Sequence, residues 1–307
     1  MTVLITGGTG LIGSEIVRQL LARGERVVVL SRQMPDAVSR LLPPGVEAMR
    51  VDIRDALEVR EAVRESGADR ILHLAAYLSE ECEREPDMAV SVNVDGTLNL
   101  LTAAVANDVG RFVFASSIAL YGPGDIVFEE DTLPIGPVRL YGQTKQLGEA
   151  LCARYQELQG LDYVALRYGG VFGPGGEVRS SGMSGLRHLL KQTMWGQDVV
   201  LEGASGEECF QYIYAKDAAR ASLMALDCPA LQHRCYNIAG PLENYISLKG
   251  FHAAIRNVAP QAGQARFVGH SQSGLRVSID RIRNDLGFTP SLSVEDGLRD
   301  EYRRSLN

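Results

Sequence analysis

The chain has 307 residues, of which 45% are hydrophobic, and a formal net charge of −7. This size and composition predict a globular protein with one large core, or one core and a smaller lobe, and exclude a disordered chain. The acidic balance, which no basic cluster offsets, argues against nucleic-acid and membrane partners. A small molecule is therefore the expected partner.

The sequence carries no evident targeting or metal-binding signal. We find no apolar run of about 18 residues and no room for a signal peptide before the first strand, and we therefore expect a cytoplasmic protein. The five cysteines are scattered, without a Cys-x-x-Cys pair or a nearby histidine. This distribution predicts free thiols and indicates neither a metal site nor a disulfide framework.

The first expected strand leads directly into a glycine-rich turn. Val3–Ile5 is an apolar run suited to a buried parallel strand, and apolar residues from Leu11 to Leu21 recur at helical spacing. Glycines at a strand-to-helix turn let a pyrophosphate approach the backbone, and the helix N-terminus supplies N–H donors and positive potential. The turn therefore predicts a dinucleotide site formed by Gly7, Gly10, Leu11, Ile12 and Gly13.

The end of the second strand bears on which dinucleotide binds. We expect this strand at Arg26–Leu30, with Arg32 just beyond it. At this place an acidic residue bonds the 2′-hydroxyl of NAD, whereas an arginine accommodates the 2′-phosphate of NADP. Arg32 thus favours NADP; the alternative is a solvated surface charge, with NAD bound without the acidic contact. The third strand, Val46–Val51, is followed by Asp52 and Ile53 where the adenine would lie.

A helix over Asp55–Ser66 leads to the fourth strand, Arg70–Leu74. This strand runs into Leu74-Ala75-Ala76, where small residues leave room for the cofactor backbone. His73 is either a catalytic base or, as is more usual within an apolar strand, a structural histidine. The charge-rich run Glu80–Glu85 is typical of a solvated surface.

Pro86–Asp108 is expected to form one long helix. Asn93 is polar within its apolar face, so it either braces the active site through buried hydrogen bonds or faces solvent. The expected apolar face consists of Val90, Val94, Leu98 and Leu101.

Three residues suggest alcohol–carbonyl chemistry. Ser117 follows the fifth strand, Arg111–Ala115, and Tyr141 and Lys145 are four residues apart at the start of a helix that reaches about Leu158. Their spacing places the phenol and the ammonium on one helix face. A neighbouring ammonium favours the phenolate, so we expect a lowered pKa for Tyr141 and acid/base action near neutral pH. A nicotinamide would exchange hydride with the neighbouring carbon.

Together these motifs resemble the extended short-chain dehydrogenases/reductases, also called the NAD-dependent epimerase/dehydratase family. The resemblance runs through nearly the whole chain, as far as Tyr236–Gly240 and Leu286–Pro290. It implies a homodimer and an α/β fold, with a doubly wound parallel-sheet Rossmann domain and a smaller, discontinuous C-terminal substrate lobe. It also implies that Ser117, Tyr141 and Lys145 are catalytic, and that the cofactor is bound by the glycine turn, Arg32, Asp52, Ile53, Leu74, Ala75, Ala76, Asn93, Tyr141 and Lys145.

The substrate lobe is expected to consist of separated segments. Residues 1–168, completed by segments near 209–240, would form the dinucleotide domain, and 169–208 and 241–307 mainly the lobe. Substrate would lie between them, at the carboxyl edge of the sheet. The candidate substrate residues are Leu78, Ser79, Ser117, Gly169, Gly170 and Phe210.

Departures from the family pattern restrict the substrate. Family members that act on nucleotide sugars commonly carry asparagine at the position of Gly170 and a diphosphate-clamping arginine at that of Phe210. Losing that arginine makes a nucleotide-diphosphate substrate less favoured. Phe210 either makes the pocket more apolar or packs in the core, with Arg179 or Arg276 supplying the clamp. The segment after the fifth strand also lacks the acidic pair typical of sugar 4,6-dehydratases.

The sequence therefore predicts an NAD(P)-dependent oxidoreductase that interconverts a secondary alcohol and a ketone on a small sugar-like or other hydroxylated substrate. The alternative is a nucleotide-sugar 4-epimerase with a transient ketone and tightly bound NAD. A non-catalytic dinucleotide sensor is a more remote alternative, because such proteins typically lack the Tyr/Lys pair that this chain retains.

Overall fold

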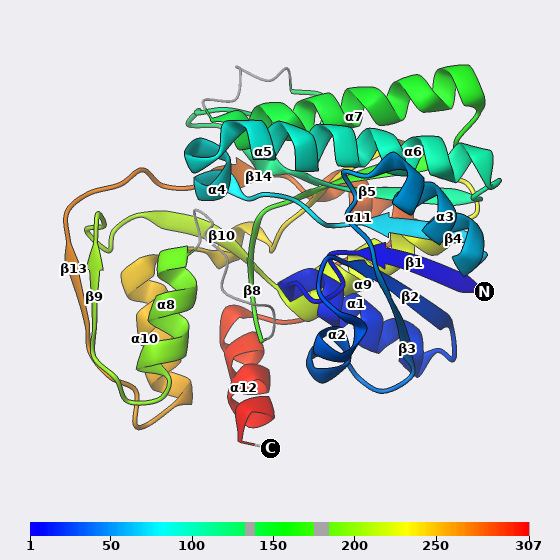
Figure 1. The fold of residues 1–307 in the computed structure, drawn as a ribbon. Coiled ribbons are helices and arrows are strands. Elements are labelled where there is room, and N and C mark those ends of the chain that lie inside the picture. The colour runs from blue at the N-terminus through cyan, green and yellow to red at the C-terminus, as the bar shows by residue number, and fades with distance from the viewer. Residues whose placement is uncertain (133–138, 175–183, 307) are drawn as a thin grey trace.

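The computed structural model describes residues 1–132, 139–174 and 184–306. A seven-stranded parallel sheet with the order β11-β7-β5-β4-β1-β2-β3 forms its larger part (Figure 1). The chain leaves β1 in both directions, which is the doubly wound arrangement and confirms the predicted fold class. The strands are β1 (Thr2–Thr6), β2 (Arg26–Ser31), β3 (Val46–Arg50), β4 (Arg70–His73), β5 (Arg111–Ser117), β7 (Tyr163–Tyr168) and β11 (Cys235–Ile238).

Helices cover both faces of this sheet, and its central strands are therefore apolar throughout rather than alternating. Residues Val3–Ile5 and Val27–Leu30 are buried accordingly. One face packs against α1 (Leu11–Ala22), α2 (Pro35–Leu41), α9 (Ala215–Asp227) and α11 (Asp280–Leu286). The other packs against α3 (Ala56–Ser66), α6 (Gly96–Ala106) and α7 (Leu140–Gln159).

A second hydrophobic core lies outside the main sheet, on the left in Figure 1. At its centre Phe172 packs edge-on against Tyr212 and Phe251, with 4.7 Å between the ring centroids of Tyr212 and Phe251. The elements around it are α8 (Ser184–Thr193), α10 (Leu248–Val258), α12 (Val294–Ser305), the sheet of β8 (Gly170–Phe172), β10 (Cys209–Tyr214) and β12 (Tyr245–Ser247), and the pair β9 (Val199–Glu202) and β13 (Ala265–Val268). A short pair, β6 (Val127–Phe128) and β14 (Arg276–Val277), completes the strands described.

The predicted long helix is interrupted. It consists of α5 (Pro86–Val90), a π-helical turn over Ser91–Asp95, and α6. The predicted apolar face is wrong in part, because Val90 and Leu98 are exposed while Leu101 is buried. The buried face is displaced by about one residue and consists of Ala89, Asn93, Thr97 and Leu100.

By length and composition, one described helical stretch could cross a membrane. Its residues are Pro86–Ala106, and its most apolar window has a mean hydropathy of 1.2, although the sequence-based search for an apolar run overlooked it. Half of that window is buried inside the protein, and the core helix of a soluble protein passes the same test. This feature is weak evidence for a membrane span, and the cytoplasmic location stays a prediction.

The charge-rich run after β4 forms a short helix, α4 (Ser79–Arg84), and is not simply solvated. Glu81 accepts a hydrogen bond from the Leu78 N–H at 2.8 Å, which caps α4 itself. Glu83 accepts one from the Leu140 N–H at 3.0 Å, at the first residue of α7. These carboxylates satisfy N–H groups that a helix start leaves without backbone partners. They fix the start of the helix that carries Tyr141.

Candidate active site

The carboxyl ends of the central strands open into a cavity of about 570 Å³. It lies at the edge of the sheet where doubly wound folds bind ligands. Every residue predicted for the site lines it, apart from Asn93. These lining residues are Gly7, Gly10, Leu11, Ile12, Gly13, Arg32, Asp52, Ile53, Leu74, Ala75, Ala76, Leu78, Ser79, Ser117, Tyr141, Lys145, Gly169, Gly170 and Phe210.

The turn between β1 and α1 is packed so closely that it requires glycine. Gly7 has φ +72°, and a Cβ there would lie 2.8 Å from the Ala75 nitrogen. At Gly13 a Cβ would lie 2.2 Å from the carbonyl oxygen of Gly7, well inside contact distance. The turn is closed by a 3.0 Å hydrogen bond from the Gly10 N–H to that same oxygen. Backbone therefore lines this end of the cavity without side chains in the way.

The start of α1 fits the pyrophosphate of a dinucleotide. No side chain caps this helix, and its first turn contains no acidic residue. The N–H groups and the positive end of the helix dipole are thus available to an anion. The segment after β4 is held beside the turn, because the Thr6 hydroxyl accepts a 3.1 Å hydrogen bond from the Ala75 N–H.

Asp52 and Arg32 lie at the far wall, where the adenosine is expected. Arg54 pairs with the Asp52 carboxylate at 2.6 Å and, with a smaller contribution from Arg32, keeps the pKa of that carboxyl below its usual value. Arg32 itself is exposed. This wall therefore presents an ionised carboxylate beside the arginine.

Ser117, Tyr141 and Lys145 come together at the middle of the cavity. Ser117 ends β5, and the other two residues lie on consecutive turns of α7. The Lys145 ammonium lies 5.7 Å from the centre of the Tyr141 ring and donates a 2.8 Å hydrogen bond to the Ala115 carbonyl oxygen. A phenol, a hydroxyl and a fixed ammonium thus converge where a substrate oxygen can be held.

The expected lowering of the Tyr141 pKa is wrong for this structure. Burial raises the pKa of Tyr141 to about 12, and a hydrogen bond with Ser117 opposes that shift only in part. Burial also lowers the pKa of Lys145 to about 8. Removing both groups from water disfavours both charged forms, and this effect exceeds the attraction that helical spacing alone suggested.

His73 is structural. It is buried between β1 and α6, with Nδ1 2.7 Å from the Thr6 hydroxyl and Nε2 3.0 Å from the Thr97 hydroxyl. Burial lowers its pKa to about 3, so the imidazole is neutral at physiological pH. It is not among the residues that line the cavity.

Asn93 is buried and acts as a brace, the first of the two alternatives considered for it. Its side chain accepts from the Tyr77 N–H at 2.7 Å and donates to the Tyr77 carbonyl and the Thr144 hydroxyl, both at 3.0 Å. These bonds fix the segment after β4 to α7, next to Lys145. Asn93 therefore supports the cavity from behind its wall rather than lining it.

A buried ion-pair network supports the end of β5. Ser116 donates a 2.5 Å hydrogen bond to Glu149, and Arg167 donates to both oxygens of that carboxylate at 2.9 and 2.7 Å. Arg167 also donates to the Tyr121 hydroxyl at 2.8 Å. Because each charge has several partners, the network holds Ser116, and with it the neighbouring Ser117, in a fixed position.

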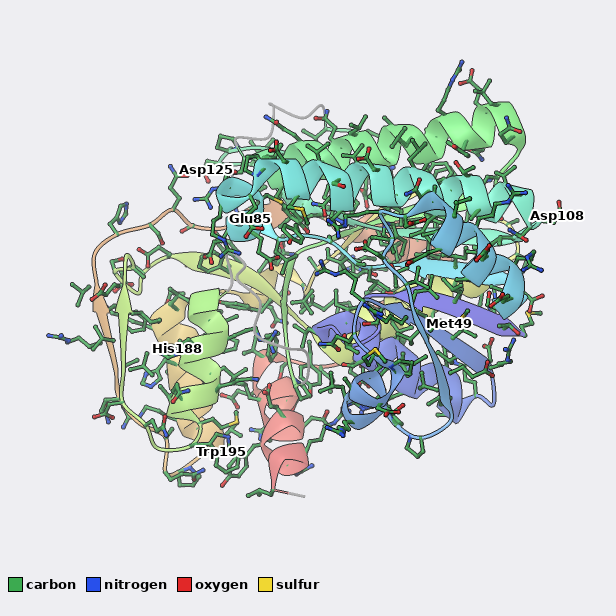
Figure 2. The ribbon with its side chains drawn as sticks, viewed as in Figure 1. Met49, Glu85, Asp108, Asp125, His188 and Trp195 are labelled. Carbon is green, nitrogen blue, oxygen red and sulfur yellow. The ribbon has the colours of Figure 1, made fainter. Side chains whose placement is uncertain are left out.

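Phe210 lines the cavity and also packs against neighbouring residues, so both roles considered for it apply. Its ring centroid is 6.2 Å from that of Tyr212, and a Cβ on Gly274 would lie 2.7 Å from its ring. Arg276 does not line the cavity; it pairs with Asp125, labelled in Figure 2, at 2.6 Å. The other predicted clamp, Arg179, lies outside the described residues.

Several lining residues were not predicted from the sequence. Some of them flank residues that were predicted, namely Gly169, Gly170 and Phe210. The others come from segments in which no motif was found, where only the helical amphipathicity around α8 gave any signal. Those at the substrate end are Tyr168, Val171, Arg187, Gln211, Gly274 and Leu275.

The described part of the chain contains no cluster of three or more His, Cys, Asp or Glu side chains placed to hold a metal ion. All five cysteines are free. Burial raises the pKa of the Cys82 thiol to about 11, which keeps it protonated and unreactive.

Comparison with known proteins places this cavity among nicotinamide-dependent enzymes. The model of the NAD dependent epimerase/dehydratase family matches residues 3–239. A putative UDP-glucose 4-epimerase of Methanocaldococcus jannaschii is 27% identical over 301 residues, which cover 97% of this chain and 96% of that relative.

Solved structures include both epimerases and dehydrogenases. The UDP-glucose 4-epimerase of Thermus thermophilus, in complex with NAD, is 30% identical, has a TM-score of 0.84 and is matched over 99% of both chains. An L-threonine dehydrogenase of Cupriavidus necator is 26% identical, has a TM-score of 0.87, and is matched over 99% of this chain and 100% of its own. The shared fold thus supports two reaction types, and the substrate end of the cavity must distinguish them.

Proposed function

This chain belongs to the NAD-dependent epimerase/dehydratase family, and we propose that it is a dehydrogenase acting on a small hydroxylated substrate that carries no nucleotide. As a member of the extended short-chain dehydrogenases/reductases, it is an NAD-dependent enzyme that interconverts a secondary alcohol and a ketone. The observation that carries the proposal is the wall formed by Phe210 against Gly274.

That wall stands where nucleotide-sugar enzymes of the family are expected to clamp a diphosphate. A phenyl ring offers no charge-assisted hydrogen bond to phosphate, and the Gly170 position offers no side-chain amide. Among the described residues, Arg276 is paired away from the cavity and does not replace the clamp, which leaves Arg187 as the one guanidinium at the substrate end. The remaining space suits a smaller molecule beside the dinucleotide.

The three central residues have distinct roles in the proposed reaction. In oxidation, Tyr141 must first lose its own proton, against the burial that raises its pKa; the phenolate then accepts the proton of the substrate hydroxyl, and the Ser117 hydroxyl holds the same oxygen. A bound oxidised nicotinamide would supply the acceptor for the hydride that leaves the carbinol carbon. Lys145, fixed by the Ala115 carbonyl, supplies a positive charge close to the Tyr141 ring. The reduction reverses each transfer.

We propose NAD as the cofactor. The Thermus thermophilus relative is in complex with NAD, and the preference for NADP drawn from Arg32 has no support from the comparisons. The cavity accommodates the dinucleotide through the glycine turn and the uncapped start of α1.

The decisive experiment follows the cofactor during turnover. Purified protein is incubated with NAD or NADP and panels of polyols, hydroxy acids, sugars and nucleotide sugars, and reduced nicotinamide and isomerised product are both measured. Stoichiometric formation of NADH with a small substrate supports the proposal. Isomerised nucleotide sugar without net redox change would establish the epimerase alternative, which the epimerase relatives favour.

We also propose a homodimer, as the family resemblance implies. In Figure 1, α5, α6 and α7 lie side by side along one edge of the molecule. Their outer faces expose apolar side chains, which favour burial against a second copy through the same surface. These residues are Val90, Leu98, Leu147 and Leu158. Sedimentation of a monomer at assay concentration would contradict the proposal.

A further inference from the structure

Within the described residues, one charged side chain from the second core lines the substrate end of the cavity. Of the charged residues that line the cavity, Arg32 and Asp52 lie at the adenosine wall and Lys145 lies beside Tyr141. Arg187 is the remaining one within the described residues, and it comes from α8. In Figure 2 that helix is marked by His188, the next residue after Arg187.

Two other polar side chains at this end, those of Gln211 and Tyr168, are engaged in hydrogen bonds within the protein. The Gln211 amide donates to the Gly240 and Val277 carbonyls at 2.6 and 3.1 Å and accepts from the Val277 N–H at 2.8 Å. The Tyr168 hydroxyl lies 2.7 Å from the Ser222 hydroxyl, in a buried pair. Neither side chain has capacity left for recognising a charged ligand.

The Arg187 side chain is part of the cavity wall and is not fully exposed to solvent. It is half-buried, and burial lowers its pKa, so its charge has lost part of its hydration. Glu301, itself 7% exposed, acts electrostatically on it from α12. Burial raises the pKa of Glu301 to about 7, so this carboxyl group is only partly ionised near neutral pH and compensates the Arg187 charge only in part. A guanidinium remains protonated under such conditions, and its incomplete hydration makes an anion a favourable neighbour.

We propose that Arg187 binds an anionic group of the substrate, so that the enzyme acts on hydroxylated acids rather than on neutral alcohols or sugars. This inference rests on the proposed dehydrogenase function and names its substrate class. A carboxylate and a phosphate ester share the chemistry that a guanidinium fork recognises. The cavity of about 570 Å³ must also receive the dinucleotide, which restricts the acid to a small one.

The test compares matched substrates in matched variants. The carboxylate arm pairs L-threonine with L-threoninamide and 3-hydroxybutyrate with 3-hydroxybutanamide; the phosphate arm pairs glycerol 3-phosphate with glycerol. The variants are Arg187→Gln, Arg187→Lys and the control Lys191→Gln. Lys191 also interacts electrostatically with Glu301 from α8 but does not line the cavity.

We expect wild-type enzyme to prefer the anionic member of at least one pair. Arg187→Gln should lower kcat/KM for that acid roughly 10- to 100-fold, as the loss of a hydrogen bond to a charged group does, and should leave its neutral partner within about threefold. Arg187→Lys should retain part of the preference, and Lys191→Gln all of it. Cofactor binding, followed by fluorescence of NADH, should be unchanged in each variant and shows that the variant has folded.

Two results would overturn the inference while leaving the dehydrogenase in place. One is a wild-type preference for the neutral members of the pairs. The other is an equal loss on acid and neutral substrates in Arg187→Gln, which would assign the residue a structural role. Isomerised nucleotide sugar without net NADH would instead remove the proposed function itself, and the inference with it.

Discussion

The two ends of the cavity are built differently. The nucleotide end consists of backbone from one short turn, where Gly7 and Gly13 leave no space for a Cβ. The substrate end consists of side chains from separate segments, including Arg187, Phe210 and the Gly274–Leu275 stretch. Backbone packed this closely tolerates no substitution, whereas each side chain of the other wall can change by itself. The fold therefore keeps its cofactor while its substrate changes, consistent with relatives of both reaction types.

The largest effect is expected from a substitution in the glycine turn at the nucleotide end. Gly13→Ala should reduce NADH binding at least about 100-fold, because its Cβ would lie 2.2 Å from the Gly7 carbonyl oxygen and the turn must open. Titration of NADH fluorescence measures this. Gly250→Ala in α10 is the control, because its Cβ would meet nothing closer than 3.4 Å; it should bind normally. Normal binding by Gly13→Ala would mean that the turn is not specified by its packing.

The nucleotide end is also the part that sequence can predict. The spacing of its glycines is a local feature of the sequence. A polar Asn93 within an apolar segment also indicated a buried bracing residue as one of two alternatives, and its hydrogen bonds confirm that alternative. The apolar face predicted for the same helix was displaced by about one residue. Val90 and Leu98 are as apolar as the buried Leu100, so hydropathy alone does not say which of two adjoining stripes packs against the sheet.

The substrate end could not be derived in the same way. Arg187 and Gln211 are neighbours of the cavity only because strands and helices far apart in the chain meet there. The predicted lowering of the Tyr141 pKa was wrong for a related reason. The burial of Tyr141 is a property of the whole fold, whereas helical spacing reports only the distance to Lys145. Local patterns predict local geometry, and tertiary burial decides the charge states.

Between the two ends, Tyr141 is predicted to carry the proton transfer. Tyr141→Phe should lower kcat roughly 10²- to 10⁴-fold, because the general base is removed, while NADH binding stays within about threefold. Tyr155→Phe is the matched control: it removes a phenol on the same helix that is hydrogen-bonded to Thr102. Steady-state kinetics and NADH titration measure both effects. Turnover close to that of wild type in Tyr141→Phe would refute the role and revive the sensor alternative.

Phe210 tests whether the substrate wall alone sets the substrate class. Phe210→Arg should weaken kcat/KM for the small substrate about tenfold, because a guanidinium would lie against Gly274 in place of an apolar ring. The same variant should let UDP inhibit competitively, since it supplies the missing phosphate contact. Phe210→Leu is the control, which keeps the wall apolar and should leave UDP without effect. Inhibition of the wild-type enzyme by micromolar UDP would show that a diphosphate already binds without this arginine.

The smallest expected effect concerns Glu301, which interacts electrostatically with Arg187. Burial raises its pKa from 4.5 to about 7 in the folded protein. The folded state therefore holds this proton more tightly than the unfolded state, and the associated stability, present below pH 4.5, is lost as pH rises through 7. Glu301→Gln removes that dependence. From urea unfolding, the stability of wild type relative to Glu301→Gln should fall by roughly 1–3 kcal/mol between pH 4.5 and 8.

The control for this experiment is Glu295→Gln on the same helix, where the glutamate pairs with Arg299 at the surface. Its relative stability should change by less than about 0.5 kcal/mol over the same range, because a surface pair is screened by solvent. An unchanged difference between wild type and Glu301→Gln would mean that Arg187 and its neighbours hold Glu301 ionised throughout. The charge of Arg187 would then be compensated from within the protein at every pH tested. Its attraction for an anionic substrate would be weaker as a result.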